Sequence, residues 1–263
     1  MTAIAERRLL QVRDAMIAAR PAVTSRYARE LALMPLIYFL YFLVRARAVG
    51  NTTEAFRNAN HVISVERWLG IFKELELQNA TSLSYDVLLH FFNIVWFYGH
   101  WPVIIVCGAW LFVKRPQIYT LTRNAFLATG AIALVVYALF PVVPRHFIGD
   151  GVDYTLTVSY VMNSEKSALV NPFAPLPSMH VGWNFLIAAG LFLAFPGSRL
   201  RYLLVLIPIL TWVSTVATGS HYIIDGFAGI CVALVGLLVA FWFQRTGGQM
   251  VMRLLPQRPG LGF

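Results

Sequence analysis

His221 and Asp225 are the residues whose types and spacing most clearly suggest chemistry. Asp225 is the only formally charged residue between Arg201 and Arg245, in an otherwise apolar stretch, and an acid in such a setting is usually functional. On a helix, a spacing of four places both side chains on one face. A carboxylate that holds one imidazole nitrogen raises the basicity of the other. The pair therefore predicts a nucleophile or base, with a structural hydrogen-bonded pair as the alternative.

A second cluster, Pro177-Ser178-Met179-His180, precedes the apolar run 181–195. Ser178 is a favourable N-cap, and the helix that it opens would present free backbone N–H groups and a positive dipole end. Such a helix end is an anion site. His180, in or beside the first turn, is then placed to donate a proton to an oxygen that leaves a bound phosphate. The alternative is a polar residue at a helix boundary.

Several further residues are candidates for contact with a phosphate or its substituents. Arg145 ends an apolar run, and its guanidinium suits bidentate phosphate contact, although an interfacial anchor explains it equally well. Tyr222, His100 and His146 are candidate substrate contacts. His100 lies within a long apolar run, so we expect it to be hydrogen-bonded inside the bundle, whereas we expect His146 to face solvent.

The elements that must position these residues are membrane helices. Of the 263 residues, 58% are hydrophobic and 13% are charged, and the mean hydropathy is +0.65. Runs of roughly 20 apolar residues indicate spanning helices, because backbone groups inside a bilayer must be paired within the chain. We predict an all-α integral membrane protein, a bundle of six transmembrane helices with a short amphipathic interfacial helix around 62–72 in the first outer loop. The six spans are 31–44, 87–113, 124–144, 167–198, 202–224 and 226–244.

The distribution of basic residues predicts the orientation. Residues 1–30 form a basic cytosolic arm, either amphipathic on the membrane surface or solvated; residues 31–244 form the membrane catalytic domain, and 245–263 a cytosolic tail. The predicted inner segments carry 14 of the 21 Lys and Arg residues, so both termini are expected in the cytosol. Arg145, His180 and His221 then all lie at the extracytoplasmic face. The Arg-over-Lys bias points to a bacterial inner (plasma) membrane.

The composition also argues against other classes of protein. The net charge of +9 comes from residues that flank the spans, which is not the basic patch of a nucleic-acid-binding protein. Cys107 and Cys231 both lie in apolar runs and predict neither a disulfide framework nor a metal site. Asp150 and Asp153 are expected to belong to a turn and not to a metal site. We predict no metal and no cofactor.

These motifs resemble the type 2 phosphatidic acid phosphatase superfamily of membrane lipid phosphatases and phosphotransferases. Its three signatures are Lys-x6-Arg-Pro, Pro-Ser-Gly-His and Ser-Arg-x5-His-x3-Asp. Residues 177–180 are similar to the second signature, with Met179 in place of Gly, and His221-x3-Asp225 is similar to the end of the third. The resemblance covers roughly residues 85–243.

Two departures from the family pattern concern its cations. Thr215 stands six residues before His221, where the family has Arg, and Ala138 stands seven residues before Arg145, where the family has Lys. With Pro-Arg, Pro-Ser-Met-His and Gly-Ser-His-Tyr, the sequence most resembles the inositolphosphotransferase branch, which includes inositol phosphorylceramide synthases. The resemblance leaves the substrate, the acceptor and the oligomeric state open.

The resemblance implies a two-step mechanism. His221, oriented by Asp225, forms a phosphohistidine while His180 protonates the departing alcohol, and water or a second alcohol then takes the phosphoryl group. Arg145 and the backbone around Ser178 and Met179 would bind the phosphate. The implied partners are a membrane lipid substrate, a lipid phosphate or a phosphoinositol-type lipid, and an alcohol acceptor. The alternative function is a non-catalytic lipid-binding or transport protein with a decayed site.

Overall fold

The structure is a computed structural model that describes residues 27–28, 30–45, 51–83, 86–148 and 173–254. The predicted tail from 255 onward, most of the basic arm, and Asp150 and Asp153 lie outside the described residues. The chain divides into two compact units, residues 1–44 and 45–263. In the first, residues 30–44 belong to a helix, in agreement with the predicted span 31–44. Within the described residues there are helices and loops and no strands.

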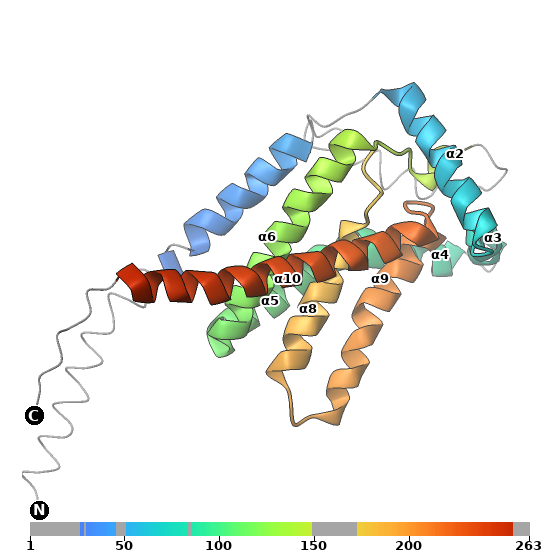
Figure 1. Cartoon of the computed structure of the whole chain (residues 1–263). Coiled ribbons are helices and arrows are strands. Elements are labelled where there is room, and N and C mark those ends of the chain that lie inside the picture. The colour runs from blue at the N-terminus through green and yellow to red at the C-terminus, as the bar shows by residue number, and fades with distance from the viewer. Residues whose placement is uncertain (1–26, 29, 46–50, 84–85, 149–172, 255–263) are drawn as a thin grey trace, which may run out of the picture. The chain divides into compact units, whose positions relative to one another are not determined.

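The second unit contains the long helices (Figure 1). In chain order the elements are α2 (Thr52–Trp68), α3 (Glu74–Leu83), α4 (Asp86–Asn93), the π-helix η1 (Ile94–Gly99), α5 (His100–Lys114), α6 (Pro116–Leu139), the 3₁₀ turn η2 (Arg145–Phe147), α8 (Met179–Ala194), the 3₁₀ segment η3 (Arg199–Val205), α9 (Leu206–Ala217) and α10 (Ile223–Leu254). α10 continues past the predicted boundary at 244 and through Gly247 and Gly248, although a Gly-Gly pair usually marks a turn.

Four helical stretches among the described residues are long and apolar enough to cross a membrane: Val87–Lys114, Pro116–Leu139, Arg199–Ala217 and Ile223–Thr246. α8 is apolar but has only 16 residues, because residues 173–178, directly before it, are not helical. The membrane character of these segments is therefore confirmed, while the count of six spans stays a prediction.

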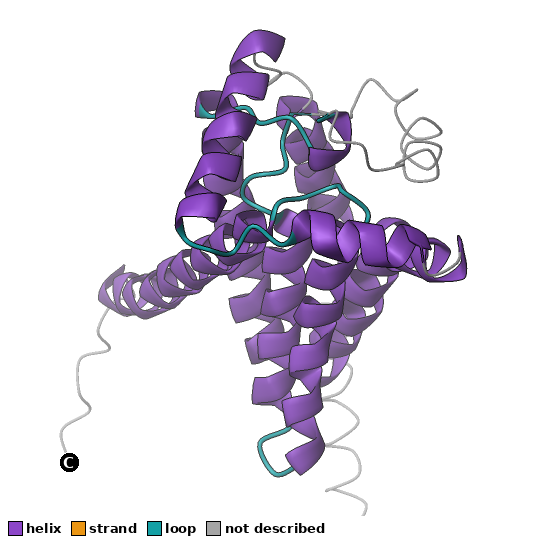
Figure 2. Ribbon diagram, turned by 90° about the vertical axis from the view of Figure 1, so that its right-hand side faces the viewer, coloured by secondary structure: helices purple, strands orange, loops and turns teal. Residues whose placement is uncertain are grey.

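α8 is the central helix of the second unit. It packs against α5, α6, α9 and α10, and most of its residues are buried, which explains its apolar sequence on all sides. Glycines allow its closest approach to α10: a Cβ on Gly182 would lie 2.7 Å from the carbonyl oxygen of Gly229, and a Cβ on Gly229 would lie 2.3 Å from that of Ser178. Figure 2 gives a side view of the described elements, in which helices are joined by loops.

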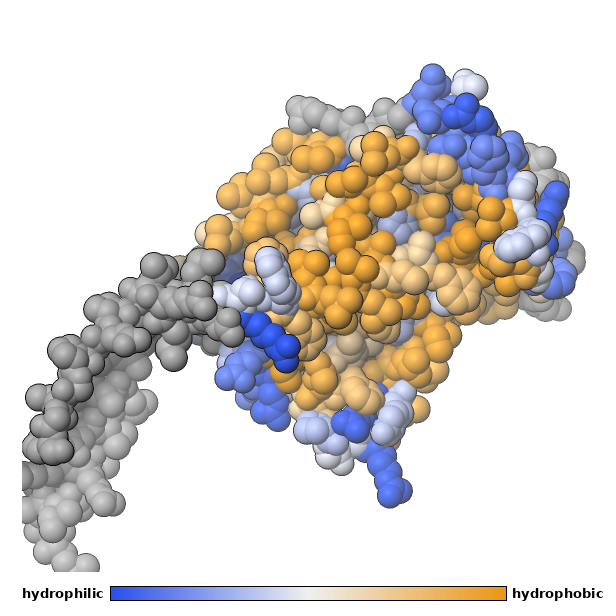
Figure 3. Space-filling model, viewed as in Figure 1, coloured by the Kyte–Doolittle hydropathy of each residue, from blue (hydrophilic) through white to orange (hydrophobic). Residues whose placement is uncertain are grey.

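The outer surface of the helices is apolar. Figure 3 shows a broad hydrophobic band on the face in view, with hydrophilic residues over α2 and α3 and again at the opposite end of the bundle. Exposed side chains such as Ile105, Val135, Leu238 and Trp242 contribute to the apolar exterior. An exposed apolar surface of this kind is suited to contact with lipid.

The predicted interfacial helix at 62–72 has different bounds in the structure, and its place at the membrane interface stays a prediction. The helix there is α2, which starts at Thr52 with Asn51 as N-cap and ends at Trp68. Val62 and Ile63 are buried and pack with Val142, Val143 and Tyr222. Val65 and Trp68 of the same helix are exposed, so α2 buries one apolar pair against the protein and leaves another on the surface. The segment 51–83 folds over the end of the bundle that carries the motifs.

Candidate active site

A tight turn positions His221. α9 ends at Ala217, and Gly219 adopts a φ of 68°, a left-handed conformation that glycine tolerates best. The backbone N–H groups of Ser220 and His221 both donate to the carbonyl of Thr215, at 3.0 and 3.1 Å. His221 therefore lies in the turn before α10, so the expectation that it shares a helix with Asp225 is wrong.

The contact between His221 and Asp225 forms across the start of α10. Oδ2 of Asp225 lies 3.1 Å from Nδ1 of His221 and accepts the backbone N–H of Tyr222 at 2.9 Å. One carboxylate thus holds the imidazole and the first turn of the helix together. Asp225 is fully buried, and His221 is nearly so. With Nδ1–H donating to the carboxylate, the other ring nitrogen, Nε2, carries the lone pair.

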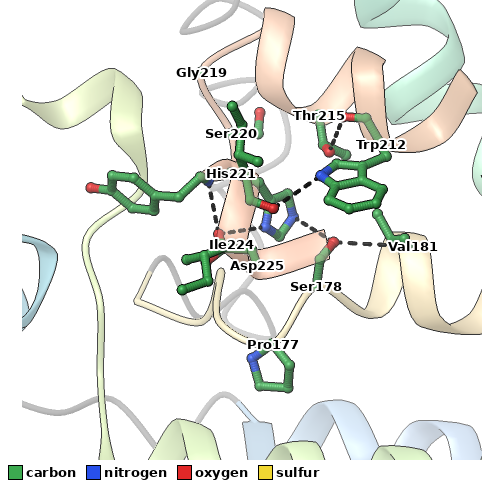
Figure 4. Close-up of polar contacts among 12 residues, drawn as sticks. Pro177, Ser178, Val181, Trp212, Thr215, Gly219, Ser220, His221, Ile224 and Asp225 are labelled. Atoms are coloured by element: carbon green, nitrogen blue, oxygen red, sulfur yellow. Dashed lines mark hydrogen bonds and ion pairs between the residues drawn. The ribbon is translucent and has the colours of Figure 1, made fainter. Parts of the chain in front are cut away.

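The Ser178 motif lies directly beside that nitrogen. Ser178 Oγ is 3.4 Å from His221 Nε2 and also accepts the backbone N–H of Val181 at 3.4 Å, which confirms Ser178 as the N-cap of α8. The backbone N–H of Ser178 donates to the carbonyl of Asp225 at 3.0 Å. Figure 4 shows Ser178 between the start of α8 and His221. Met179 is the first residue of α8 and is buried.

His180 faces His221 from the other side. Their ring centroids are 5.5 Å apart, and His180 is only partly buried. The ring of His100 is 4.6 Å from that of His180, and the ring of Trp96 is 6.3 Å from it. Trp96 lies in the π-helical segment η1, a type of distortion that is frequent at functional sites. The acid candidate therefore has aromatic neighbours from η1 and from the start of α5.

Asn184 ties this aromatic group to the bundle. Its Nδ2 lies 3.0 Å from Nδ1 of His100, 3.0 Å from the carbonyl of His180 and 3.1 Å from Oγ1 of Thr211. His100 is thus buried and hydrogen-bonded, as its place in an apolar run predicted. Sequence reasoning missed Asn184, Thr211 and Trp96, although Asn184 follows His180, and Trp96 precedes His100, by four residues.

The segment after α6, which contains Arg145 and His146, lies along a further side of the site. Arg145 is 2% exposed, and its guanidinium lies over the ring of Phe72, 5.5 Å from the centroid. The backbone N–H of His146 donates to the carbonyl of Gly219 at 2.7 Å, and Nδ1 of His146 lies 3.1 Å from the same oxygen. The structure therefore brings the Arg145 segment against the turn that carries His221.

Two of the candidate substrate contacts have other partners. The expectation that His146 faces solvent is wrong: the ring is partly buried at Gly219, and burial lowers its pKa to about 4, so it is neutral at physiological pH. The hydroxyl of Tyr222 is buried and donates to the carbonyl of Val143 at 2.9 Å. Burial, together with the nearby Asp225, raises the pKa of Tyr222. The hydroxyl is therefore a neutral donor that joins the turn before α10 to the segment after α6.

The first outer loop supplies polar side chains that the sequence did not single out. Asn58 Nδ2 donates to the carbonyl of Pro141 at 2.9 Å, and Gln78 Nε2 donates to that of Val216 at 2.8 Å. Glu66 and Glu74 are fully buried and accept backbone N–H groups at the start of α10. Glu66 follows Val62 by four residues, so the buried face of α2 was the available signal.

No cation replaces the family arginine at Thr215. This residue is fully buried, and its Oγ1 donates to the carbonyl of Trp212 at 2.8 Å. Within the part of the chain that the structure describes, no group of three or more His, Cys, Asp or Glu side chains is placed to hold a metal ion. The arrangement can supply a nucleophilic nitrogen, a facing imidazole and a helix N-terminus, which together suit chemistry at a phosphorus atom.

The helical membrane bundle and its facing histidines define a class of membrane proteins with a histidine-based site. Comparisons with known proteins agree with this class. The family model described as the PAP2 superfamily matches residues 60–239, and the chain belongs to that superfamily. The chain is 29% identical over 164 residues to an uncharacterized protein of Methanocaldococcus jannaschii, which covers 61% of this chain and 63% of that relative. The crystal structure of Aquifex aeolicus LpxE matches with a TM-score of 0.50 and 18% identity, over 66% of this chain and 93% of that chain.

The chain spans slightly less than two thirds of the length of the curated relative that it matches. The match to LpxE shows that the fold is shared. The inositolphosphotransferase branch, the histidine mechanism and the orientation in the membrane stay predictions.

Proposed function

We propose that this protein is a membrane-embedded lipid phosphatase or phosphotransferase that works through a phosphohistidine at His221. The observation that carries the proposal is the orientation of this imidazole. Asp225 holds Nδ1, which leaves Nε2 beside the N-terminus of α8 and facing His180. A non-catalytic protein would have no need for a buried carboxylate that fixes one tautomer.

In the first step, Nε2 of His221 attacks the phosphorus and the bond from phosphorus to the lipid oxygen breaks. His180 donates a proton to that leaving oxygen, while Asp225 stabilises the positive charge on His221. In the second step, water or an alcohol gives its proton to His180 and attacks the phosphorus, and His221 leaves as a neutral imidazole. Backbone N–H groups at the start of α8 and the Arg145 guanidinium stabilise the equatorial oxygens.

The shortage of cations favours a phosphodiester donor, and therefore transfer of a group such as inositol phosphate. A phosphodiester carries one negative charge, whereas a phosphomonoester approaches two at neutral pH. Among the three family cation positions, only Arg145 is retained, and Thr215 and Ala138 are uncharged. Each missing cation removes electrostatic attraction for the negatively charged phosphate, and this attraction is stronger in a poorly solvated site than in water. We place this site at the extracytoplasmic face of a bacterial inner membrane, with both termini in the cytosol.

A substrate comparison tests the proposal. The purified protein and the His221→Ala variant are incubated with labelled phosphatidic acid or labelled phosphatidylinositol, with and without a diacylglycerol or ceramide acceptor. We expect turnover that depends on His221. Inorganic phosphate as the only product under all acceptors would restrict the activity to that of a phosphatase. Equal lipid processing by the wild type and His221→Ala would contradict an enzyme of this mechanism and favour a lipid-binding or transport protein.

A further inference from the structure

Two buried glutamates from the first outer loop meet at the start of α10. Glu66 is near the end of α2 and Glu74 is the first residue of α3, and both are 0% exposed. Glu66 Oε1 accepts the backbone N–H of Ile224 at 2.8 Å, and Glu74 Oε1 accepts that of Ile223 at 3.2 Å. These N–H groups belong to the first turn of α10, which has no preceding carbonyls to bind.

Each of the two carboxyl groups has a second oxygen that is also buried. Among the described residues, Oε2 of Glu66 and Oε2 of Glu74 are buried and receive no hydrogen bond from any other group. The two side chains are in hydrogen-bonding contact, which two carboxyl groups can make only if one of them carries a proton. Burying two adjacent negative charges would be far more costly than burying one.

We propose that Glu66 and Glu74 share one proton and act as positioning residues that set the start of α10, and through it the His221–Asp225 pair. Ile223 and Ile224 directly precede Asp225 in the chain, and the Asp225 carboxylate closes the same turn by accepting from Tyr222. A displacement of this turn moves the carboxylate that orients the proposed nucleophile. The inference rests on the proposed function and adds two residues from a loop outside the family motifs.

The electrostatic surroundings agree with one shared proton. Burial and the hydrogen bond with Glu74 raise the pKa of Glu66 to about 9, and the negative charge of Asp225 adds to this effect. Tyr222 and Arg145 are the other titratable or charged groups that interact within this cluster. Because the unfolded chain releases the Glu66 proton at a lower pH than the folded chain, stability is lost as the pH rises toward about 9.

Substitutions at Glu66 separate a shared proton from simple packing. Glu66→Gln keeps the acceptor for Ile224 and supplies an N–H for Glu74, so it mimics the protonated pair. Glu66→Leu leaves the N–H of Ile224 and the carboxylate of Glu74 without their partner. With fluorescent phosphatidic acid in detergent micelles at pH 7, we expect near wild-type kcat for Glu66→Gln. For Glu66→Leu we expect a kcat about 10- to 100-fold lower with little change in KM, as for a misplaced catalytic group.

The pH dependence provides a second measurement, which does not need turnover. The Tm of the purified protein, followed by tryptophan fluorescence, should fall between pH 7 and 9.5 for the wild type and stay flat for Glu66→Gln. The matched control is Glu76→Gln, an exposed acid on α3 that pairs with Lys73, and it should follow the wild type. The inference is overturned if Glu66→Gln follows the wild-type slope, or if Glu66→Leu and Glu66→Gln have equal kcat. If even the wild type turns over no lipid, the proposed function fails, and the Tm series still decides the shared proton.

Discussion

The two histidines of the site are held in very different ways. His221 is nearly buried and lies in a turn whose backbone and side chains are fixed by Thr215, Asp225 and Ser178. His180 is partly exposed on the first turn of α8, and besides His221 its ring neighbours include His100 and Trp96. One side of the site is a hydrogen-bonded framework, and the other is a group of aromatic rings.

This difference corresponds to what each proposed role demands. A nucleophile must present one nitrogen in one direction at both steps, which a fixed tautomer and a rigid turn provide. His180 acts first as an acid toward the departing lipid oxygen and then as a base toward the water or alcohol that replaces it. Its ring must therefore be able to reach both oxygens. The aromatic neighbours of His180 limit the space in which its ring can move, but they do not fix which hydrogen bonds it makes. The following predictions test this division, from the largest expected effect to the smallest.

Removal of the proposed nucleophile should have the largest effect. We expect His221→Ala to lower kcat by a factor of about 10⁴ or more, because the loss of a covalent nucleophile cannot be offset by binding alone. His61→Ala, at an exposed histidine on α2, is the control and should retain wild-type kcat. Residual activity within about tenfold of the wild type would place the nucleophile elsewhere.

Removal of the proposed acid should have a smaller effect, and one that depends on the leaving group. We expect His180→Ala to lower kcat on a lipid substrate by about 10²- to 10⁴-fold. Part of this loss should be recovered with an aryl phosphate such as p-nitrophenyl phosphate, whose leaving group needs no proton. His221→Ala should show no such recovery. An equal loss on both substrates would argue against proton donation by His180.

The close packing of α8 on α10 joins the two sides, so disturbing it should reduce activity and stability together. A Cβ on Gly229 would lie 2.3 Å from the carbonyl oxygen of Ser178, which cannot move without shifting the start of α8. We expect Gly229→Ala to destabilise the protein by about 1–3 kcal/mol and to lower kcat. Gly108→Ala, on α5 with no atom within 4 Å of the added methyl group, should leave both unchanged or slightly raise Tm.

The smallest predicted effect concerns pH. Because the pKa of His146 is lowered to about 4 in the folded protein, the unfolded chain binds more protons between about pH 6.5 and 4. This contribution to stability is present above that range and is lost as the pH falls through it. We expect a decrease of Tm of a few degrees over this interval, reduced in His146→Asn. An identical acid dependence in both proteins would contradict a buried, neutral His146.

The comparison also shows which features the sequence could predict. Apolar runs marked most helices, and the N-cap role of Ser178 followed from its residue type and its position before an apolar run. The place of His221 did not follow, because the turn depends on the left-handed Gly219 and on hydrogen bonds to Thr215. A spacing of four suits a helix and this turn equally well.

The surroundings of the site were harder to predict than its central residues. Glu66 and Glu74 lie about 150 residues before the helix turn that they bind, with sequence separations of 158 and 149 to their partners. A local sequence pattern does not indicate contacts between residues so far apart in the chain, and acids in a loop are usually solvated. The amphipathic pattern of α2 was visible, but it did not reveal that Val62 and Ile63 would pack against the protein while Val65 and Trp68 stay exposed.

The most direct test of the central claim is the chemical identity of the reaction intermediate. The protein is mixed with a ³²P-labelled lipid phosphate, quenched in alkali to preserve phosphohistidine, digested and mapped by mass spectrometry. Because Asp225 holds Nδ1, the account predicts phosphate on Nε2 of His221 and none in the His221→Ala variant. Phosphate on His180, or undiminished labelling of the His221→Ala variant, would contradict it.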